Sequence, residues 1–165
     1  MTTPIVHKDT EKGTLTVTTQ FDAPVDRIWQ LWSDPRQLER WWGPPTYPAT
    51  FVDHNLMPGG IVNYYMTGPE GDRSGGQWHI RTVEPPHKLE FEDAFADDDG
   101  NVNPDLPVTV ITVTLEAGSG GETHMSIHSA FPSLEAMQQV LDMGLEEGML
   151  ESISQIDGLL AEDAA

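Results

Sequence analysis

The feature that most constrains the fold is a change in the spacing of apolar residues near residue 133. Before it, short segments alternate apolar and polar residues, which is typical of strands with one buried face. After it, apolar residues recur every three or four positions for about seven turns, which predicts one long amphipathic helix. Ser133 can cap the start of that helix. Its apolar positions are Leu134, Met137, Val140, Leu141, Leu145, Met149, Ile153, Ile156, Leu159 and Leu160.

Two short helices are predicted between the first strand and the others. The first covers residues 24–33, where an early-helix proline precedes Trp29 and Trp32 at helical spacing. The second begins at Asp34-Pro35 and ends with Trp41 and Trp42. The predicted strands are residues 14–21, 49–55, 61–67, 76–83, 88–95, 108–115 and 123–131.

This order of elements predicts an α+β protein with helices on one side of an antiparallel sheet. At 165 residues the chain is expected to form one domain over residues 1–165, with ragged ends at 1–13 and 161–165. Glu162 and Asp163 oppose the helix dipole, so the C-terminal end is expected to fray. Gly144 and Gly148 each cost helix propensity, which favours a close approach to the sheet there or space for a ligand.

Charge and cysteine content narrow the classes of function. The formal net charge is −19, there are no cysteines, and residues 89–165 hold 17 acidic residues and no Lys or Arg. An acidic surface disfavours nucleic acids and anionic membranes, and no apolar run is long enough to span a bilayer. Without cysteine there is no disulfide or thiolate metal site. We therefore expect a cytoplasmic protein, whose acidic face either serves solubility or meets a basic protein partner.

Several short segments together resemble the START-like (SRPBCC) superfamily, and most closely its activator of heat-shock protein 90 ATPase-like family. They are Ala23-Pro24 with Trp29, Asp34-Pro35, Trp41-Trp42-Gly43-Pro44, Pro58-Gly59-Gly60, Gly76 with Trp78, Val83-Glu84-Pro85-Pro86-His87-Lys88-Leu89, and Thr123. The resemblance covers residues ~14–160 and implies a helix-grip fold. In that fold a curved antiparallel sheet, here of about six to seven strands, wraps around the long C-terminal helix and encloses a cavity. Such families include co-chaperones, lipid carriers and polyketide cyclases.

Catalytic and metal-binding motifs are not found in the sequence. There is no His-Glu-x-x-His, no Gly-x-Ser-x-Gly and no phosphate-binding loop. Asp97-Asp98-Asp99-Gly100 resembles part of a calcium loop, but Phe95 falls at the first ligand position. We therefore expect no metal and no cofactor. His54 beside Asp53 is either a general base in a cavity or a lone polar strand residue.

The predicted ligand cavity follows from strand alternation combined with the resemblance. On strand 61–67 the inward set is Val62, Tyr64 and Met66, and Tyr64 and His54 are its candidate polar groups. The complete set is Trp32, Val62, Tyr64, Met66, Trp78, Ile80, Phe91, Leu141, Leu145, Met149 and Ile153. These side chains either line an adaptable apolar pocket or fill the core completely.

The sequence thus predicts a protein that binds a small, largely apolar molecule and has no catalytic activity of its own. Two alternatives stay open. One is a cyclase- or hydrolase-type enzyme that uses Tyr64 or His54 as acid or base. The other is a co-chaperone-like interaction protein that binds a basic partner through its acidic C-terminal half. A homodimer also stays open.

Overall fold

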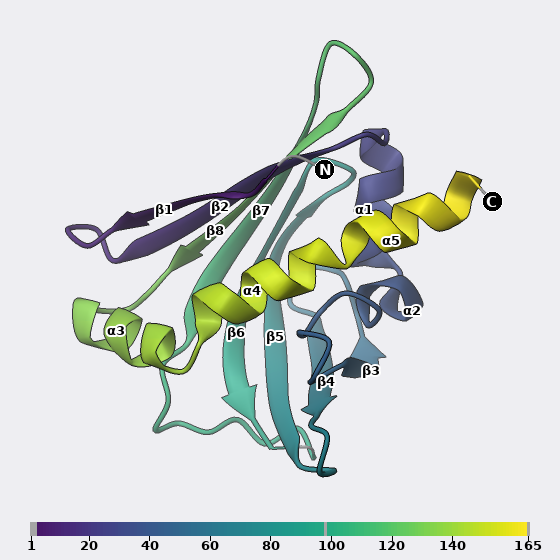
Figure 1. Cartoon of the computed structure of the whole chain (residues 1–165). Helices are drawn as coiled ribbons and strands as arrows, with labels where there is room; N and C mark the ends of the chain where they lie inside the picture. Colours follow the sequence, from purple (N-terminus) through teal and green to yellow (C-terminus); the bar gives the residue numbers. More distant parts are fainter. Residues whose placement is uncertain (1–2, 98, 165) are drawn as a thin grey trace.

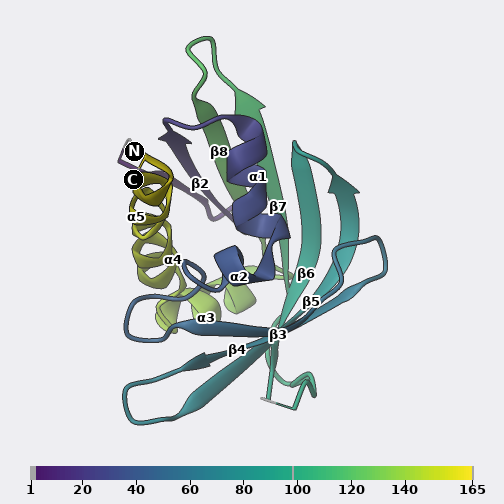
Figure 2. The ribbon, with the colours of Figure 1, turned by 90° about the vertical axis from the view of Figure 1, so that its right-hand side faces the viewer.

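The computed structural model describes residues 3–97 and 99–164, and these form one eight-stranded antiparallel sheet with helices on its concave face (Figures 1 and 2). The strand order is β1-β2-β8-β7-β6-β5-β4-β3. The strands are β1 Ile5–Asp9, β2 Thr14–Phe21, β3 Ala49–His54, β4 Ile61–Thr67, β5 Arg73–Glu84, β6 Lys88–Ala96, β7 Thr109–Ala117 and β8 Thr123–Ala130. The predicted α+β helix-grip architecture is confirmed.

The described residues also form five α-helices and one 3-10 helix. They are α1 Val25–Ser33, α2 Pro35–Leu38, α3 Leu134–Asp142, α4 Leu145–Ser154, α5 Ile156–Ala161 and η1 Glu162–Ala164. The single C-terminal helix of the prediction is therefore wrong in detail, because the helical stretch is interrupted twice. Gly144, at φ +90, adopts a left-handed conformation and bends the chain between α3 and α4. The second predicted short helix ends at Leu38, before the two tryptophans.

The ends of the described chain are more ordered than predicted. Residues 5–9 form β1, which pairs with β2 along its length and raises the strand count to eight. At the other end, Asp163 accepts a hydrogen bond from Arg27, and Glu162 pairs with Arg40. These ion pairs offset the unfavourable dipole at the end of α5 and in η1. Residues 1, 2 and 165 lie outside the described part of the chain.

The main core is formed where α1, α2 and the segment after them meet the inner face of the sheet. Trp32 and Trp41 contact edge to face, with their ring centroids 4.7 Å apart. On the sheet, Trp78 stacks on Phe91 at 4.0 Å and lies 6.4 Å from Trp32. The Trp41 indole N–H donates to the Leu31 carbonyl. Aromatic contacts of this kind add to the free energy of apolar burial, so the two short helices are held firmly to the sheet.

We predict that Trp32→Ala destabilises the protein by about 3–5 kcal/mol, because it removes a fully buried ring from this cluster. Trp29→Ala, a change on the same helix at a half-buried ring, serves as the control and should cost clearly less. Urea denaturation followed by circular dichroism measures both free energies of unfolding. Equal losses for the two variants would contradict the assignment of Trp32 to the centre of the core.

Candidate functional site

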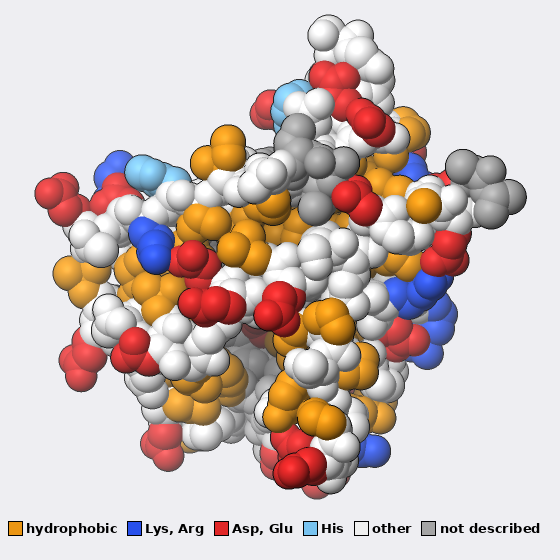
Figure 3. Space-filling model, in the orientation of Figure 1, with side chains coloured by type: hydrophobic (Ala, Val, Ile, Leu, Met, Phe, Trp, Pro, Cys, Tyr) orange, Lys and Arg blue, Asp and Glu red, His pale blue; other side chains and the backbone are white. Residues whose placement is uncertain are grey.

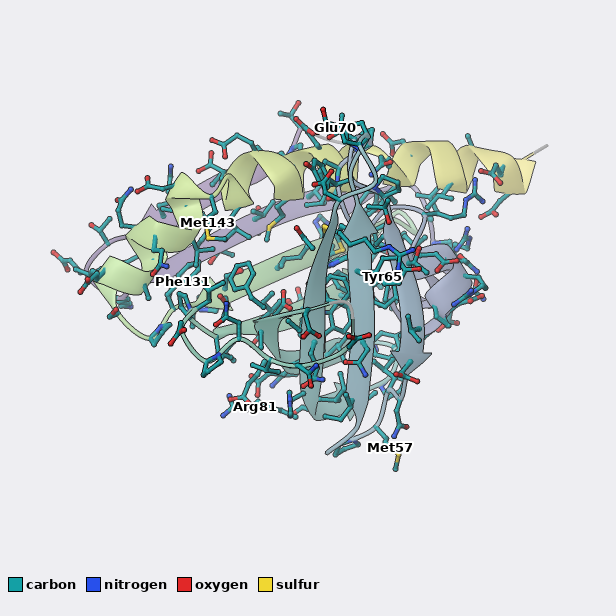
Figure 4. The ribbon with its side chains drawn as sticks, turned by 90° about the horizontal axis from the view of Figure 1, so that it is seen from below. Met57, Tyr65, Glu70, Arg81, Phe131 and Met143 are labelled. Carbon is teal, nitrogen blue, oxygen red and sulfur yellow. The ribbon has the colours of Figure 1, made fainter. Side chains whose placement is uncertain are left out.

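A cavity of about 360 Å³ lies between the inner face of the sheet and the joint of α3 and α4. Strands β4 to β8 form its floor, and the segment from Trp41 to Tyr47 forms one wall. In the space-filling view the surface is hollowed below α4, with hydrophobic side chains on both sides of the hollow (Figure 3). Met143 lines the cavity and is 54% exposed, which places it at the opening, at the joint between the two helices (Figure 4).

Small residues on the helical side keep this space open. Gly144, Gly148 and Ser152 all line the cavity, at four-residue spacing along the helical segment. Apart from the backbone of its own helix and its two chain neighbours, a Cβ atom placed on Gly148 would meet no atom within 4 Å. The glycines therefore do not serve a close approach of the helix to the sheet. They leave space in the cavity. Space for a ligand was one of the two explanations that the sequence offered for glycines at positions where they weaken the helix.

The polar centre of the cavity is a hydrogen-bonded pair, Tyr64 on β4 and Asp93 on β6. The Tyr64 hydroxyl donates to Asp93 Oδ1 at 3.1 Å. Both residues line the cavity, and the Asp93 side chain stays partly accessible from it. Tyr64 also stacks on Phe51, with ring centroids 5.1 Å apart. This contact holds one face of the Tyr64 ring, while the hydroxyl points to the Asp93 carboxyl group.

Gly76 on β5 makes this position of Tyr64 sterically accessible. It pairs directly with Tyr64 in the β4–β5 register. A Cβ atom at Gly76 would overlap the ring and the hydroxyl of Tyr64. The glycine therefore lets the aromatic ring lie flat over the neighbouring strand, within reach of Asp93.

The apolar surroundings change the acid–base properties of the pair. Burial raises the pKa of Asp93 to about 7, and the hydrogen bond from Tyr64 opposes this increase. Burial also raises the pKa of Tyr64 well above its ordinary value, with the nearby Asp93 carboxyl adding to the effect. The cavity thus holds a carboxyl group that changes charge near neutral pH and a tyrosine that stays protonated.

Two further polar atoms near the cavity have no partner within the described chain. The Trp42 indole N–H and the Ser129 hydroxyl are buried without a hydrogen bond, although both residues line the cavity. The indole N–H groups of Trp42 and Trp78 face the Tyr64 hydroxyl and oppose the increase in the pKa of Tyr64, but neither has good hydrogen-bond geometry. Buried polar groups without partners cost stability, and such groups are often found where function requires them.

The structure brings together only part of the predicted cavity set. Tyr64, Met66, Leu145 and Met149 line the cavity. Most of the others lie in the core cluster and do not line it, because the tryptophans of α1 and of the following segment fill that part of the sheet–helix space. These core residues are Trp32, Val62, Trp78, Ile80, Phe91 and Ile153.

Two other predicted residues lie elsewhere. Leu141 faces a separate groove beside Lys8 and Glu146, because the bend at Gly144 turns α3 away from α4. His54 is half-buried, and its Nε2–H donates to the Trp32 carbonyl at 3.1 Å. Burial lowers its pKa. His54 does not line the cavity, so the interpretation as a polar strand residue describes it better than that of a general base.

Sequence reasoning missed Asp93 and Ser129, although strand alternation could have found both. Asp93 shares the inner face of β6 with Leu89 and Phe91, as its pairing with Trp78 shows. It is therefore a carboxylate at an apolar position. Ser129 likewise continues the inner face of β8 after Ile127. A polar residue at the inward position of a strand is the signal that was available.

No group of three or more His, Asp or Glu residues that could hold a metal ion occurs within residues 3–97 and 99–164. Over the same residues, no helix is both long enough and apolar enough to cross a membrane.

We predict that Asp93→Asn becomes more stable relative to the wild type as the pH rises from 5 to 8. The quantity compared is the free energy of unfolding of the variant minus that of the wild type. In the folded protein Asp93 keeps its proton up to a pH of about 7, whereas in the unfolded chain it loses the proton near pH 4. Ionisation within this window therefore destabilises the folded wild type, on the order of 2 kcal/mol. Urea denaturation at several pH values measures the difference. Asp105→Asn, at an exposed loop position, should show no such trend.

We also predict that Gly76→Ala destabilises the protein by about 1–3 kcal/mol, because the new methyl group displaces Tyr64. The same substitution in a Tyr64→Ala background should cost much less, since the overlapping ring is gone. The coupling free energy of this double-mutant cycle is the measurement. Additive effects would mean that Gly76 is needed for a reason unrelated to Tyr64.

Comparisons with known proteins agree with this architecture. The family model described as "Activator of Hsp90 ATPase homolog 1-like protein" matches residues 22–161. The crystal structure of protein Ms6760 from Mycobacterium smegmatis is 52% identical, with a TM-score of 0.87, covering 94% of this chain and 95% of that one. A solution structure of a protein from Arthrobacter aurescens is 50% identical, with a TM-score of 0.92, covering 98% and 93%.

A solution structure from Staphylococcus epidermidis is similar at lower identity, 28%, with a TM-score of 0.82 and coverage of 96% and 94%. The search among curated proteins gave no match. The family model spans most of the chain, and two solved structures are at least half identical to it. The chain therefore belongs to the activator of Hsp90 ATPase homolog 1-like family, within the START-like superfamily.

Proposed function

We propose that this protein binds a small, largely apolar molecule in the cavity between the sheet and the α3–α4 joint, without catalysing a reaction. The observation that carries the proposal is a cavity of about 360 Å³ that small residues of the helices leave open. A volume of this size falls within the range of small-molecule sites. Its lining is mostly aromatic and aliphatic, with few polar groups to orient a ligand.

The kind of side chain at the cavity supports binding rather than nucleophilic catalysis. Tyr64 and Asp93 are hydrogen-bonded to each other and could orient a polar group of the ligand. The lining includes the hydroxyl groups of Ser74, Ser129 and Ser152, but no histidine of the described chain lines the cavity to activate them. The START-like resemblance, which includes lipid carriers, points in the same direction.

A second candidate function, an enzyme of the cyclase or hydrolase type, is favoured by one observation. Asp93 has a pKa of about 7 and lies next to a protonated tyrosine in an apolar cavity, which is an arrangement that can transfer protons. If such an activity exists, a candidate substrate should be consumed, and Tyr64→Phe and Asp93→Asn should each abolish turnover. Loss of turnover in the His54→Ala variant alone would instead place the chemistry outside this cavity.

Ligand binding is tested first by native mass spectrometry of gently purified protein, compared with its denatured mass. We expect an excess mass that disappears on denaturation. Binding of Nile red, an uncharged apolar dye, provides the second measurement by its increase in fluorescence.

The control is a pair of substitutions on opposite faces of one strand. Ser129 faces the cavity from β8, whereas Ser126 on the same strand faces outward. Ser129→Leu adds apolar volume within the cavity and should weaken dye binding at least tenfold, while Ser126→Leu should leave it unchanged. Thermal melting shows that both variants fold. Equal binding by the two variants would place the dye elsewhere and contradict the proposal.

A further inference from the structure

The distribution of charge around the cavity is one-sided. Within residues 3–97 and 99–164, Asp93 is the only carboxylate that lines the cavity, and no Lys, Arg or His lines it. An anionic ligand would therefore bring a second negative charge into an apolar space without a compensating cation. A cationic ligand would supply the missing partner. The cavity thus discriminates by the sign of the ligand's charge.

We infer that the ligand of this cavity is a lipophilic amine, whose apolar body fills the cavity and whose protonated nitrogen pairs with the Asp93 carboxylate. This inference rests on the proposed function and adds the chemical class of the ligand. The contact with the Asp93 carboxylate can be tested separately from the binding of apolar molecules in the cavity.

Asp93 has an oxygen available for this contact. Oδ1 accepts the hydrogen bond from Tyr64, whereas Oδ2 accepts none from the described part of the chain. Asp93 is half-buried and lines the cavity, so its carboxyl group is not closed off by the surrounding side chains. An ammonium group offers up to three donors and a full charge, and a charge-assisted hydrogen bond to such a group is roughly twice as strong as a neutral one.

The walls beside Asp93 are also suited to a cation. Trp41, Trp42, Tyr47, Tyr64 and Phe95 all line the cavity. Trp42 and Tyr64 meet edge to face with centroids 6.1 Å apart, and the Tyr64 hydroxyl contacts the carboxyl group. Aromatic faces attract ammonium groups through their quadrupole and accept the apolar body of a ligand equally well. A carboxylate among aromatic rings therefore matches both parts of a lipophilic amine.

The electrostatic field of the whole protein also favours a cationic ligand. With a net charge of −19, the protein attracts cationic molecules from solution and repels anionic ones such as fatty acids. This long-range attraction is general and is screened by salt, whereas the contact with Asp93 is local. An experiment must therefore separate the two.

The protonation state of Asp93 makes amine binding dependent on pH. Around Asp93, β4 contributes Tyr64, β5 contributes Trp78 and β7 contributes Thr109, while Tyr47 lies on the wall. Helices α3 and α4 add no charged side chain to the lining. Asp93, with its pKa of about 7, is therefore the group that titrates near neutrality. Its ionised fraction increases about tenfold between pH 6 and pH 8, so amine affinity should increase by up to that factor.

The test uses three probes with one fused-ring skeleton, which are naphthylmethylamine, naphthylmethanol and naphthoate. Isothermal titration calorimetry at pH 8 and moderate salt measures their affinities for the full chain. We expect the amine to bind at least tenfold more tightly than the alcohol, and naphthoate to bind most weakly. At pH 6 the preference for the amine over the alcohol should shrink, while the affinity of the alcohol stays the same.

Two variants separate the local contact from the general field. Asp93→Asn should abolish the preference for the amine over the alcohol. Asp105→Asn removes the same charge from an exposed loop and should change neither affinity. Because Asp93→Asn removes a buried ionisable group, it should fold, and thermal melting verifies this.

The outcomes distinguish this inference from the function on which it rests. If the alcohol binds but the amine binds no better, or if both aspartate variants lose amine affinity equally, the amine assignment is overturned and the cavity remains a binding site. If naphthoate binds as well as the amine, the assignment is also overturned. If none of the three probes binds, neither the amine assignment nor the proposed function survives.

Discussion

The structure depends on the contact between the tryptophans of α1 and its following segment and the inner face of the curved sheet. Trp32, Trp41 and Trp42 form edge-to-face contacts with one another, and Trp32 and Trp42 also contact Trp78 on β5. These rings fill the space between sheet and helices at one end of the molecule. A sheet that curves around helices cannot be filled uniformly, so where the large rings end, open space begins. The core and the cavity therefore have one cause, which is that the large rings fill only part of the space between the sheet and the helices.

The cavity persists because its helical wall is built from small residues. Gly148 and Ser152 place little volume opposite the strands, and the left-handed Gly144 bends the helical segment above them. Met143 then lies at the opening, where its flexible side chain can adapt to what enters. The glycines that weaken this segment as a helix are thus the residues that leave space for the cavity beneath it.

Within the cavity, Tyr64 and Asp93 form a hydrogen-bonded pair that carries the carboxyl group of the described lining. Tyr64 reaches Asp93 because Gly76 leaves space for its ring, and Asp93 lies deep enough for burial to raise its pKa to about 7. The Asp93 carboxyl group, which lies among aromatic rings, supports the proposed preference of this cavity for a cationic ligand. The acidic character of the whole chain reinforces that preference at long range.

The sequence by itself determined the order of strands β2 to β8 and of the helical segments between and after them, because periods of two and 3.6 residues reflect local burial and are readable without tertiary contacts. It also determined that Tyr64, Met66, Leu145 and Met149 face the interior. Only the tertiary structure decided whether an inward residue lies in the core or at the cavity. Trp78 and Phe91 have the same alternation as Tyr64, yet neighbouring tryptophans bury them. The partner of Tyr64, the bend at Gly144 and the pairing of β1 likewise arise from contacts between segments distant in sequence, which no local period encodes.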